Sequence, residues 1–154
     1  MINLKAFLSM IAFSEIGAPL LSVSDNGYNV IVGSTSEHPD LFHSYADHPR
    51  KLVHLGHGLE STAAGRYQIL ERYFDDYKAM LKLPDFSPDS QDDIATQMIR
   101  ERHALPLIAL GNINDAIHLC SNIWASLPGN SYGQHENKMG ALIAHYKLAG
   151  GLLA

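Results

Sequence analysis

The segment AFSEIGAP, residues 12–19, places one carboxylate, Glu15, between an apolar run and a chain break. The apolar residues ahead of it recur at helical spacing, at Leu4, Phe7, Leu8, Ile11 and Ala12. Gly17 and Pro19 end the helix, so Glu15 lies in its last turn, near the negative end of the helix dipole. Burial and the dipole both favour the protonated form, which can act as a general acid. A solvated glutamate at a helix end remains the other interpretation.

The segment STAAGRYQIL, residues 61–70, has the residue types of a sugar contact. Gly65 lets a ligand or a neighbouring backbone approach closely. Tyr67 and Gln68 follow it, and an aromatic ring packs on the apolar face of a pyranose while an amide reaches its polar substituents. These residues are candidate substrate contacts, although Tyr67 is equally well placed to be core.

A second glycine-flanked segment, LPGNSYGQ, presents Tyr132 and Gln134 as further candidate contacts. A loop between Gly129 and Gly133 can move, and such loops often grip substrate. An ordinary surface turn is the alternative interpretation of this segment.

The other reactive residue types indicate no metal or cofactor site. His54 and His57 are close among nine histidines, but no HExxH motif is present and the glycines around them fix no geometry. Cys120 lies on an apolar helical stripe, where an inert buried thiol is expected. The sequence has no GxSxG, phosphate-binding loop or dinucleotide motif, so we expect neither metal nor cofactor.

Composition favours one globular domain, residues 1–154, with 46% hydrophobic residues. A net charge of −5 argues against a nucleic-acid partner, and one cysteine excludes an internal disulfide. The apolar run of residues 6–13 is too short for a signal peptide or a membrane span. We therefore expect synthesis in the cytoplasm with no export signal.

The elements that must position these residues suggest an α+β fold. Asn26-Gly27 predicts a turn followed by a strand at residues 28–32, and residues 33–60 suit a small irregular sheet with exposed loops. A helical period begins at Gly65, with Tyr67, Leu70, Phe74, Tyr77 and Leu81 on one face.

Three further helices are expected towards the C-terminus. Ser87 and Pro88 are typical of a helix start, and Asn112 caps another helix. The second of these helices faces inward with Ile113, Ala116, Ile117, Cys120 and Trp124. The last spans residues 136–149. The predicted organisation is a small sheet region at about residues 24–60 and a larger helical lobe of residues 1–16 and 65–150.

Six segments resemble, in order and spacing, the lambda endolysin family of lytic transglycosylases: KAFLSMIAFSE, GYNVIVG, YADHPRKLV, STAAGRYQIL, DFSPDSQD and CSNIWASLPGNSYGQ. The resemblance runs from Lys5 to about Gly151. It implies a lysozyme-like fold with the active-site cleft between the sheet region and the helical lobe. It also implies that Glu15 is the single catalytic acid, and we add Asn122 to the substrate contacts.

The resemblance implies cleavage of the MurNAc–GlcNAc β-1,4 bond of peptidoglycan with formation of 1,6-anhydro ends. Hydrolysis requires a second carboxylate; the polar loops offer Asp25, Glu37, Asp40 and Asp47, whereas position 29, an aspartate in the lambda protein, is Asn29 here. A hydrolytic muramidase of the same fold and a non-catalytic cell-wall binding module are the alternatives.

The partners implied by the resemblance are peptidoglycan glycan strands and a separate holin. We expect a monomer from a phage or prophage lysis cassette, made in the host cytoplasm and acting in the periplasm after holin-mediated release.

Overall fold

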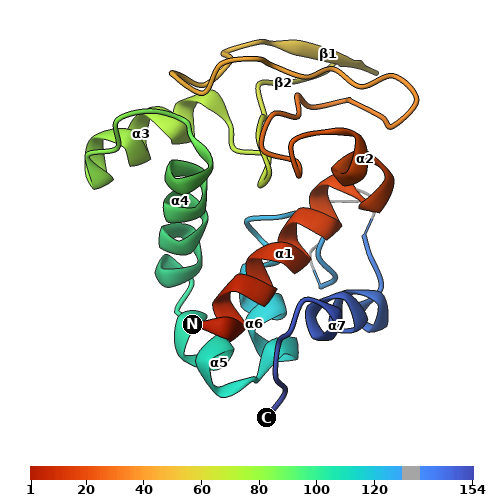
Figure 1. Cartoon of the computed structure of the whole chain (residues 1–154), viewed down its shortest axis with the longest axis vertical. Coiled ribbons are helices and arrows are strands. Elements are labelled where there is room, and N and C mark those ends of the chain that lie inside the picture. The colour runs from red at the N-terminus through yellow and green to blue at the C-terminus, as the bar shows by residue number, and fades with distance from the viewer. Residues whose placement is uncertain (130–135) are drawn as a thin grey trace. The chain divides into compact units, whose positions relative to one another are not determined.

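The computed structural model describes residues 1–129 and 136–154. In chain order its elements are α1 (Ile2–Ile16), α2 (Ala18–Val23), β1 (Val53–Gly56), β2 (Leu59–Ser61), α3 (Glu71–Leu81), α4 (Pro88–Glu101), α5 (Leu105–Leu110), α6 (Ile113–Cys120) and α7 (Met139–Leu148). The α+β class is confirmed, because helices accompany a small two-stranded antiparallel sheet (Figure 1). None of the helices within the described ranges is long and apolar enough to cross a membrane.

The chain divides into two compact units. Unit 1 comprises residues 1–15 and 95–154, and unit 2 comprises residues 16–94. Residues 65–94, which the sequence suggested for the larger helical lobe, cluster with the sheet in unit 2. The single domain of residues 1–154 stays a prediction.

The first helix, α1, ends at Ile16 as predicted, because Gly17 adopts a φ of 84° that a helix cannot continue. Its burial is wider than the predicted stripe and includes Ala6, Met10 and Ser14. Polar contacts also fix this helix: Asn3 Nδ2 donates to the carbonyl of Ile108 at 3.0 Å, and Asn3 Oδ1 accepts from the amide of Leu152 at 2.9 Å. The start of α1 is thereby joined to α5 and to the C-terminal segment.

The helix after Asn112 is confirmed, with Ile113, Ala116, Ile117 and Cys120 buried. Its predicted extent is wrong, because α6 ends at Cys120 and Trp124 lies in the turns that follow. Trp124 is nevertheless buried, with 2% of its surface exposed. The last helix, α7, begins at Met139 rather than at residue 136.

In unit 2, the turn at Asn26-Gly27 is confirmed, with both residues at positive φ and the amide of Tyr28 donating to the carbonyl of Asp25. The predicted strand at residues 28–32 is wrong. Val30 and Ile31 make only isolated bridges, to Leu41 and Ala64. A turn at Gly33, whose φ is 81°, follows at once and prevents a longer ladder.

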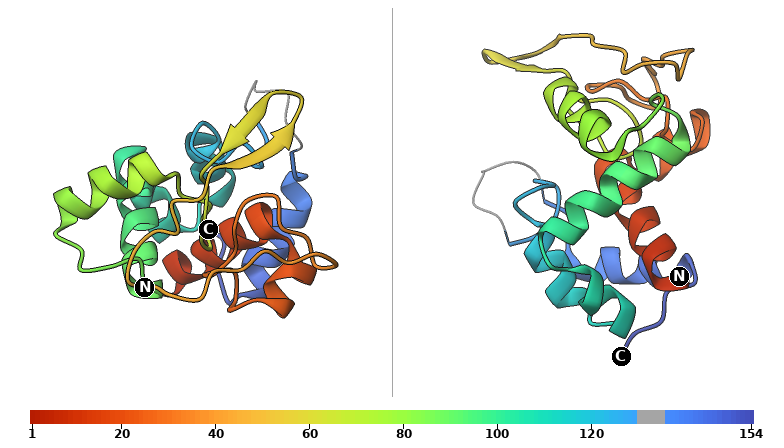
Figure 2. Two further views of the ribbon diagram at one scale, coloured as in Figure 1. Left: turned by 90° about the horizontal axis from the view of Figure 1, so that it is seen from above. Right: turned by 90° about the vertical axis from the view of Figure 1, so that its left-hand side faces the viewer.

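The regular strands are β1 and β2, which pair His54 with Glu60 in an antiparallel hairpin (Figure 2, yellow arrows in the left view). They lie within the stretch of residues 33–60 predicted to be an irregular sheet, apart from the last residue, Ser61. The predicted helix start at Gly65 is also wrong. Residues 65–70 form turns and a bridge between Ala64 and Ile69, and α3 begins only at Glu71.

The start of α4 is confirmed at Pro88, and the Ser87 hydroxyl accepts from the amide of Ser90 at 3.4 Å. Ahead of this helix, Phe86 packs in an aromatic cluster with Phe74 and His48, at ring-centroid distances of 5.0 and 4.9 Å. His48 is held neutral: Nε2 donates to the carbonyl of Ile69, Nδ1 accepts from the amide of Arg50, and burial lowers its pKa. This cluster forms the centre of unit 2.

Candidate active site

Glu15 lies in the last turn of α1, half-buried, as the sequence predicts. Its Oε2 accepts a hydrogen bond from the hydroxyl of Ser126 at 2.6 Å. Ser126 belongs to the turns between α6 and α7, so a contact across 111 positions of the sequence holds the carboxyl group. Both residues belong to unit 1.

Two more side chains extend this contact. The hydroxyls of Ser14 and Ser126 lie 2.8 Å apart. Asn137 Nδ2 donates to Ser14 Oγ at 3.0 Å and to the backbone carbonyl of Ser14 at 3.1 Å. The amide of Asn137 also donates to the carbonyl of Ser126 at 2.8 Å. The carboxyl group is thus supported by an ordered set of polar groups from three segments of unit 1.

Burial raises the pKa of Glu15 to about 7, and the hydrogen bond from Ser126 opposes part of that rise. Near neutral pH the carboxyl group therefore populates both its protonated and its ionised form. A group with this property can give up a proton and take one back during a reaction cycle.

Tyr67 and Gln68 have internal contacts in unit 2. Tyr67 is 1% exposed, and its hydroxyl donates to Asp92 Oδ1 at 2.6 Å. Tyr28 donates to the same oxygen at 2.9 Å. Gln68 Nε2 donates to the carbonyl of Gly65 at 2.9 Å. Tyr67 thus occupies the core position that the sequence left open, and glycan contact by either residue stays a prediction.

The close approach expected at Gly65 is made by the side chain of Gln91. A Cβ at position 65 would lie 2.3 Å from Gln91 Oε1. That oxygen accepts from the amide of Arg66 at 2.9 Å, while Gln91 Nε2 donates to the carbonyls of Tyr28 and Phe86. Gly65 therefore admits a buried side-chain amide that joins α4 to two loops of the same unit.

The remaining candidate contacts belong to unit 1. Asn122 is exposed in the turns after α6. Tyr132 and Gln134 lie outside the described residues. A substrate role for these three residues stays a prediction.

Of the four loop carboxylates that could serve as a second catalytic group, three have partners in unit 2, and the fourth, Glu37, is exposed. Asp25 Oδ2 accepts from the hydroxyl of Tyr45 at 2.5 Å, and Asp40 pairs with Lys51 at 2.6 Å. Asp47 binds Arg50 at 2.8 Å, and this hydrogen bond lowers the pKa of Asp47. Because the same guanidinium also binds Asp75, Asp47 belongs to an ion-pair network rather than to an isolated site.

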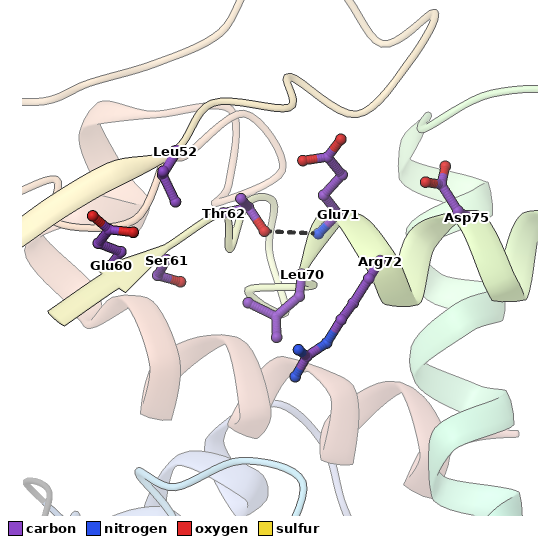
Figure 3. A pocket seen from close by; sticks show the side chains of 8 residues that line it. All are labelled: Leu52, Glu60, Ser61, Thr62, Leu70, Glu71, Arg72 and Asp75. Carbon is purple, nitrogen blue, oxygen red and sulfur yellow. Dashed lines mark hydrogen bonds between the residues drawn. The ribbon is translucent and has the colours of Figure 1, made fainter.

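A pocket of about 480 Å³ opens in unit 2 between the hairpin and α3 (Figure 3). It is lined by Leu52, Glu60, Ser61, Thr62, Leu70, Glu71, Arg72 and Asp75. Thr62 Oγ1 accepts from the amide of Glu71 at 3.0 Å and so joins its two walls. Figure 3 shows the Arg72 guanidinium directed away from the carboxylates of Glu71 and Asp75. This lining contains none of the predicted site residues in the described part of the chain.

Within residues 1–129 and 136–154 no group of three His, Cys, Asp or Glu side chains is placed to hold a metal ion. His54 instead pairs with Glu60 across the hairpin, at 2.9 Å. Cys120 is buried, and burial raises the pKa of its thiol to about 12, so it stays protonated at neutral pH.

Sequence reasoning missed Ser14, Ser126 and Asn137, which support the carboxyl group of Glu15. Ser14 and Ser126 both lie inside segments that carry the family resemblance, yet their contact joins residues 112 positions apart. No helical or strand period relates such positions, so only the folded chain shows the pairing.

A carboxyl group that titrates near neutrality suits proton transfer to a glycosidic oxygen, and a mainly helical α+β fold around it is typical of lysozyme-like enzymes. Residues 5–153 match the model of the Endolysin family. The endolysin of Escherichia phage lambda is 55% identical over 148 residues, which cover 96% of this chain and 90% of that protein. The endolysin of Escherichia phage P2 is 46% identical, covering 99% of this chain and 95% of that protein.

Solved structures give the same result. Bacteriophage lambda lysozyme complexed with a chitohexasaccharide matches with a TM-score of 0.93 and 52% identity, covering 100% of this chain and 97% of that one. A second structure of lysozyme from bacteriophage lambda, with the same coverage, matches with a TM-score of 0.84 and 51% identity. The chain belongs to the Endolysin family. It has the lysozyme-like fold and is a peptidoglycan-cleaving enzyme of phage lysis.

Proposed function

We propose that the enzyme cuts the MurNAc–GlcNAc β-1,4 bond of peptidoglycan by lytic transglycosylation, with Glu15 as both acid and base. The observation that carries this proposal is the position of Glu15 in the last turn of α1, where Ser126 donates to Oε2 and burial raises the pKa of the carboxyl group to about 7. A carboxyl group near this value donates a proton in one step and accepts one in the next with little cost in either direction.

In the first step, the O–H bond of protonated Glu15 breaks as the glycosidic oxygen takes the proton and leaves C1 of MurNAc. In the second, the Glu15 carboxylate takes the proton of the C6 hydroxyl of the same sugar, and that oxygen bonds to C1. A 1,6-anhydro ring closes, Glu15 is protonated again, and no water is consumed.

The contacts of three of the four loop carboxylates support a mechanism with one catalytic carboxylate. A hydrolase needs a second carboxylate to activate water or to form a covalent intermediate. Asp25, Asp40 and Asp47 are engaged with Tyr45, Lys51 and Arg50. The substrate of a transglycosylase supplies its own nucleophile, so these carboxylates can remain structural.

The glycan strand is the proposed partner, since the related lambda lysozyme was solved with a chitohexasaccharide. We assign substrate contact to Gln68, Asn122, Tyr132 and Gln134, and we assign Tyr67, which is 1% exposed, to the core of unit 2. We further propose a monomer that needs no metal or cofactor. It is made in the host cytoplasm, a separate holin releases it, and it acts in the periplasm.

A set of single variants tests whether one carboxylate suffices. Glu15→Gln keeps the shape of the side chain and removes its proton, so peptidoglycan clearing should fall at least about 10²-fold. Asp25→Asn and Asp47→Asn should keep at least a third of the activity if they fold. Loss of activity in either aspartate variant, with an unchanged circular dichroism spectrum, would favour a hydrolytic muramidase instead.

A further inference from the structure

We propose that Asn137, Ser14 and Ser126 form a one-way hydrogen-bond chain that positions Glu15 and confines its transferable proton to Oε1. This inference rests on the proposed catalytic role of Glu15. It assigns positioning roles to three side chains and a specific oxygen to the reacting proton.

The direction of the chain is set at Asn137. Its Nδ2 lies 3.1 Å from the backbone carbonyl of Ser14, an atom that can only accept. The nitrogen of the amide must therefore face Ser14, which fixes the orientation of the group. The same nitrogen lies 3.0 Å from Ser14 Oγ, so Ser14 Oγ accepts a hydrogen bond there.

The two serine hydroxyls continue in the same direction. Each has a single proton to donate. Ser126 gives its proton to Glu15 Oε2 at 2.6 Å. Ser126 Oγ must then be the acceptor in its 2.8 Å contact with Ser14, and Ser14 is the donor. Every donor in the chain points towards the carboxyl group.

This direction decides which oxygen of Glu15 carries the proton. Oε2 accepts from Ser126 and keeps the character of a carbonyl oxygen, so the proton of the acid form resides on Oε1. When that proton leaves, the hydrogen bond on Oε2 strengthens, because acceptors with negative charge bind donors more tightly. The chain therefore stabilises the carboxylate that forms as the glycosidic bond breaks.

The chain is not a route for protons. Its far end is a side-chain amide, which does not release a proton at accessible pH. Glu15 must therefore be protonated again from the substrate or from solvent, and under the proposed mechanism that proton comes from the C6 hydroxyl.

The test is the titration of the Glu15 side-chain carboxyl carbon, followed by ¹³C NMR in the full chain between pH 4 and pH 10. Ser126→Ala removes a donor to the carboxylate, so the measured pKa of Glu15 should rise by about one pH unit. Ser14→Ala leaves the hydrogen bond from Ser126 in place, so it should raise the pKa of Glu15 by less than Ser126→Ala does. Ser126→Thr keeps the hydroxyl and should restore the wild-type value.

Ser121→Ala is the matched control. Ser121 belongs to the same turns after α6 as Ser126, and its hydroxyl donates to the carbonyl of His118 at 2.8 Å. The pKa of Glu15 should be unchanged in this variant.

A lower pKa in Ser126→Ala would overturn the proposal, because it would mean that Glu15 donates its proton from Oε2 to Ser126. An unchanged value in both Ser126→Ala and Ser14→Ala would also overturn it. If Ser126→Ala does not fold, Ser14→Ala alone decides. The NMR titration does not depend on turnover, so a failure of the chain is distinguishable from full activity in Glu15→Gln, which would contradict the catalytic role.

Discussion

Ser126 donates a 2.6 Å hydrogen bond to Glu15 and so joins the turns after α6 to the last turn of α1. Two opposing effects meet at this carboxyl group, since burial raises its pKa and the hydrogen bond lowers it. The result is a pKa of about 7, at which a glutamate can act first as an acid and then as a base. The balance links the packing of unit 1 directly to its proposed chemistry.

The pH dependence of activity should follow the protonated form of Glu15. Because the acid form starts the reaction and the pKa of Glu15 is about 7, kcat/KM should fall about tenfold per pH unit above that value. Initial rates on purified peptidoglycan between pH 5 and pH 9 give the profile. A rate that stays constant up to pH 9 would contradict the assignment.

Stability should show the cost of ionising Glu15. Folding raises the pKa of Glu15 from 4.5 to about 7, so the folded chain favours the protonated carboxyl group. The contribution of this group to the free energy of unfolding is fully present below pH 4.5 and is lost as the pH rises through 7. Glu15→Gln cannot ionise and should therefore be more stable than the wild type at pH 8, by up to about 3 kcal/mol.

Urea unfolding at pH 8 and at pH 5 measures this difference. The advantage of Glu15→Gln should be small at pH 5, where the wild-type carboxyl group is already protonated. Equal stability of the two proteins at both pH values would mean that the pKa of Glu15 is not raised by folding.

Gly65→Ala should destabilise unit 2 by at least about 2 kcal/mol, because the φ of 82° is strained for alanine and the new Cβ displaces the amide of Gln91. Gly140→Ala is the control: Gly140 lies in α7, and among the described residues no atom beyond its chain neighbours and its own helix lies within 4 Å of the place that a Cβ would take. Alanine there should stabilise the helix by about 0.5–1 kcal/mol. Chemical denaturation compares the two. A neutral Gly65→Ala would show that Gln91 can move at little cost.

Substitutions at Trp124 and Asn122 should have different effects, one on folding stability and the other on substrate binding, although only one position lies between the two residues. Trp124→Ala removes a buried ring and should cost about 3–5 kcal/mol of folding free energy. Asn122→Ala, at an exposed position, should keep the melting temperature and raise KM for peptidoglycan. If Asn122→Ala changes neither quantity, its proposed substrate role is wrong.

The local features of the molecule could be predicted from the sequence. The end of α1 at Ile16, just after Glu15, and the start of α4 at Pro88 depend on neighbouring residues, and both are confirmed. The prediction of a strand at residues 28–32 was wrong because β-branched residues form a ladder only where a partner strand continues alongside them. Here Val30 and Ile31 each form a single isolated bridge.

The site was predictable only in part, for the same reason. Glu15 follows from the helix in which it lies, whereas Ser126 contacts it from a turn 111 positions away and Asn137 contacts Ser14 from 123 positions away. Gly65 indicated a close approach, but the glycine gave no information about the approaching group, which is the Gln91 amide.

Digestion of purified peptidoglycan in ¹⁸O-labelled water, followed by mass spectrometry of the released muropeptides, shows whether the C6 hydroxyl or water attacks C1. Intramolecular attack by the C6 hydroxyl consumes no water, so we predict anhydro ends without label, each one water lighter than a hydrolysed end. Labelled reducing ends as the main product would contradict it, because water would then be the nucleophile.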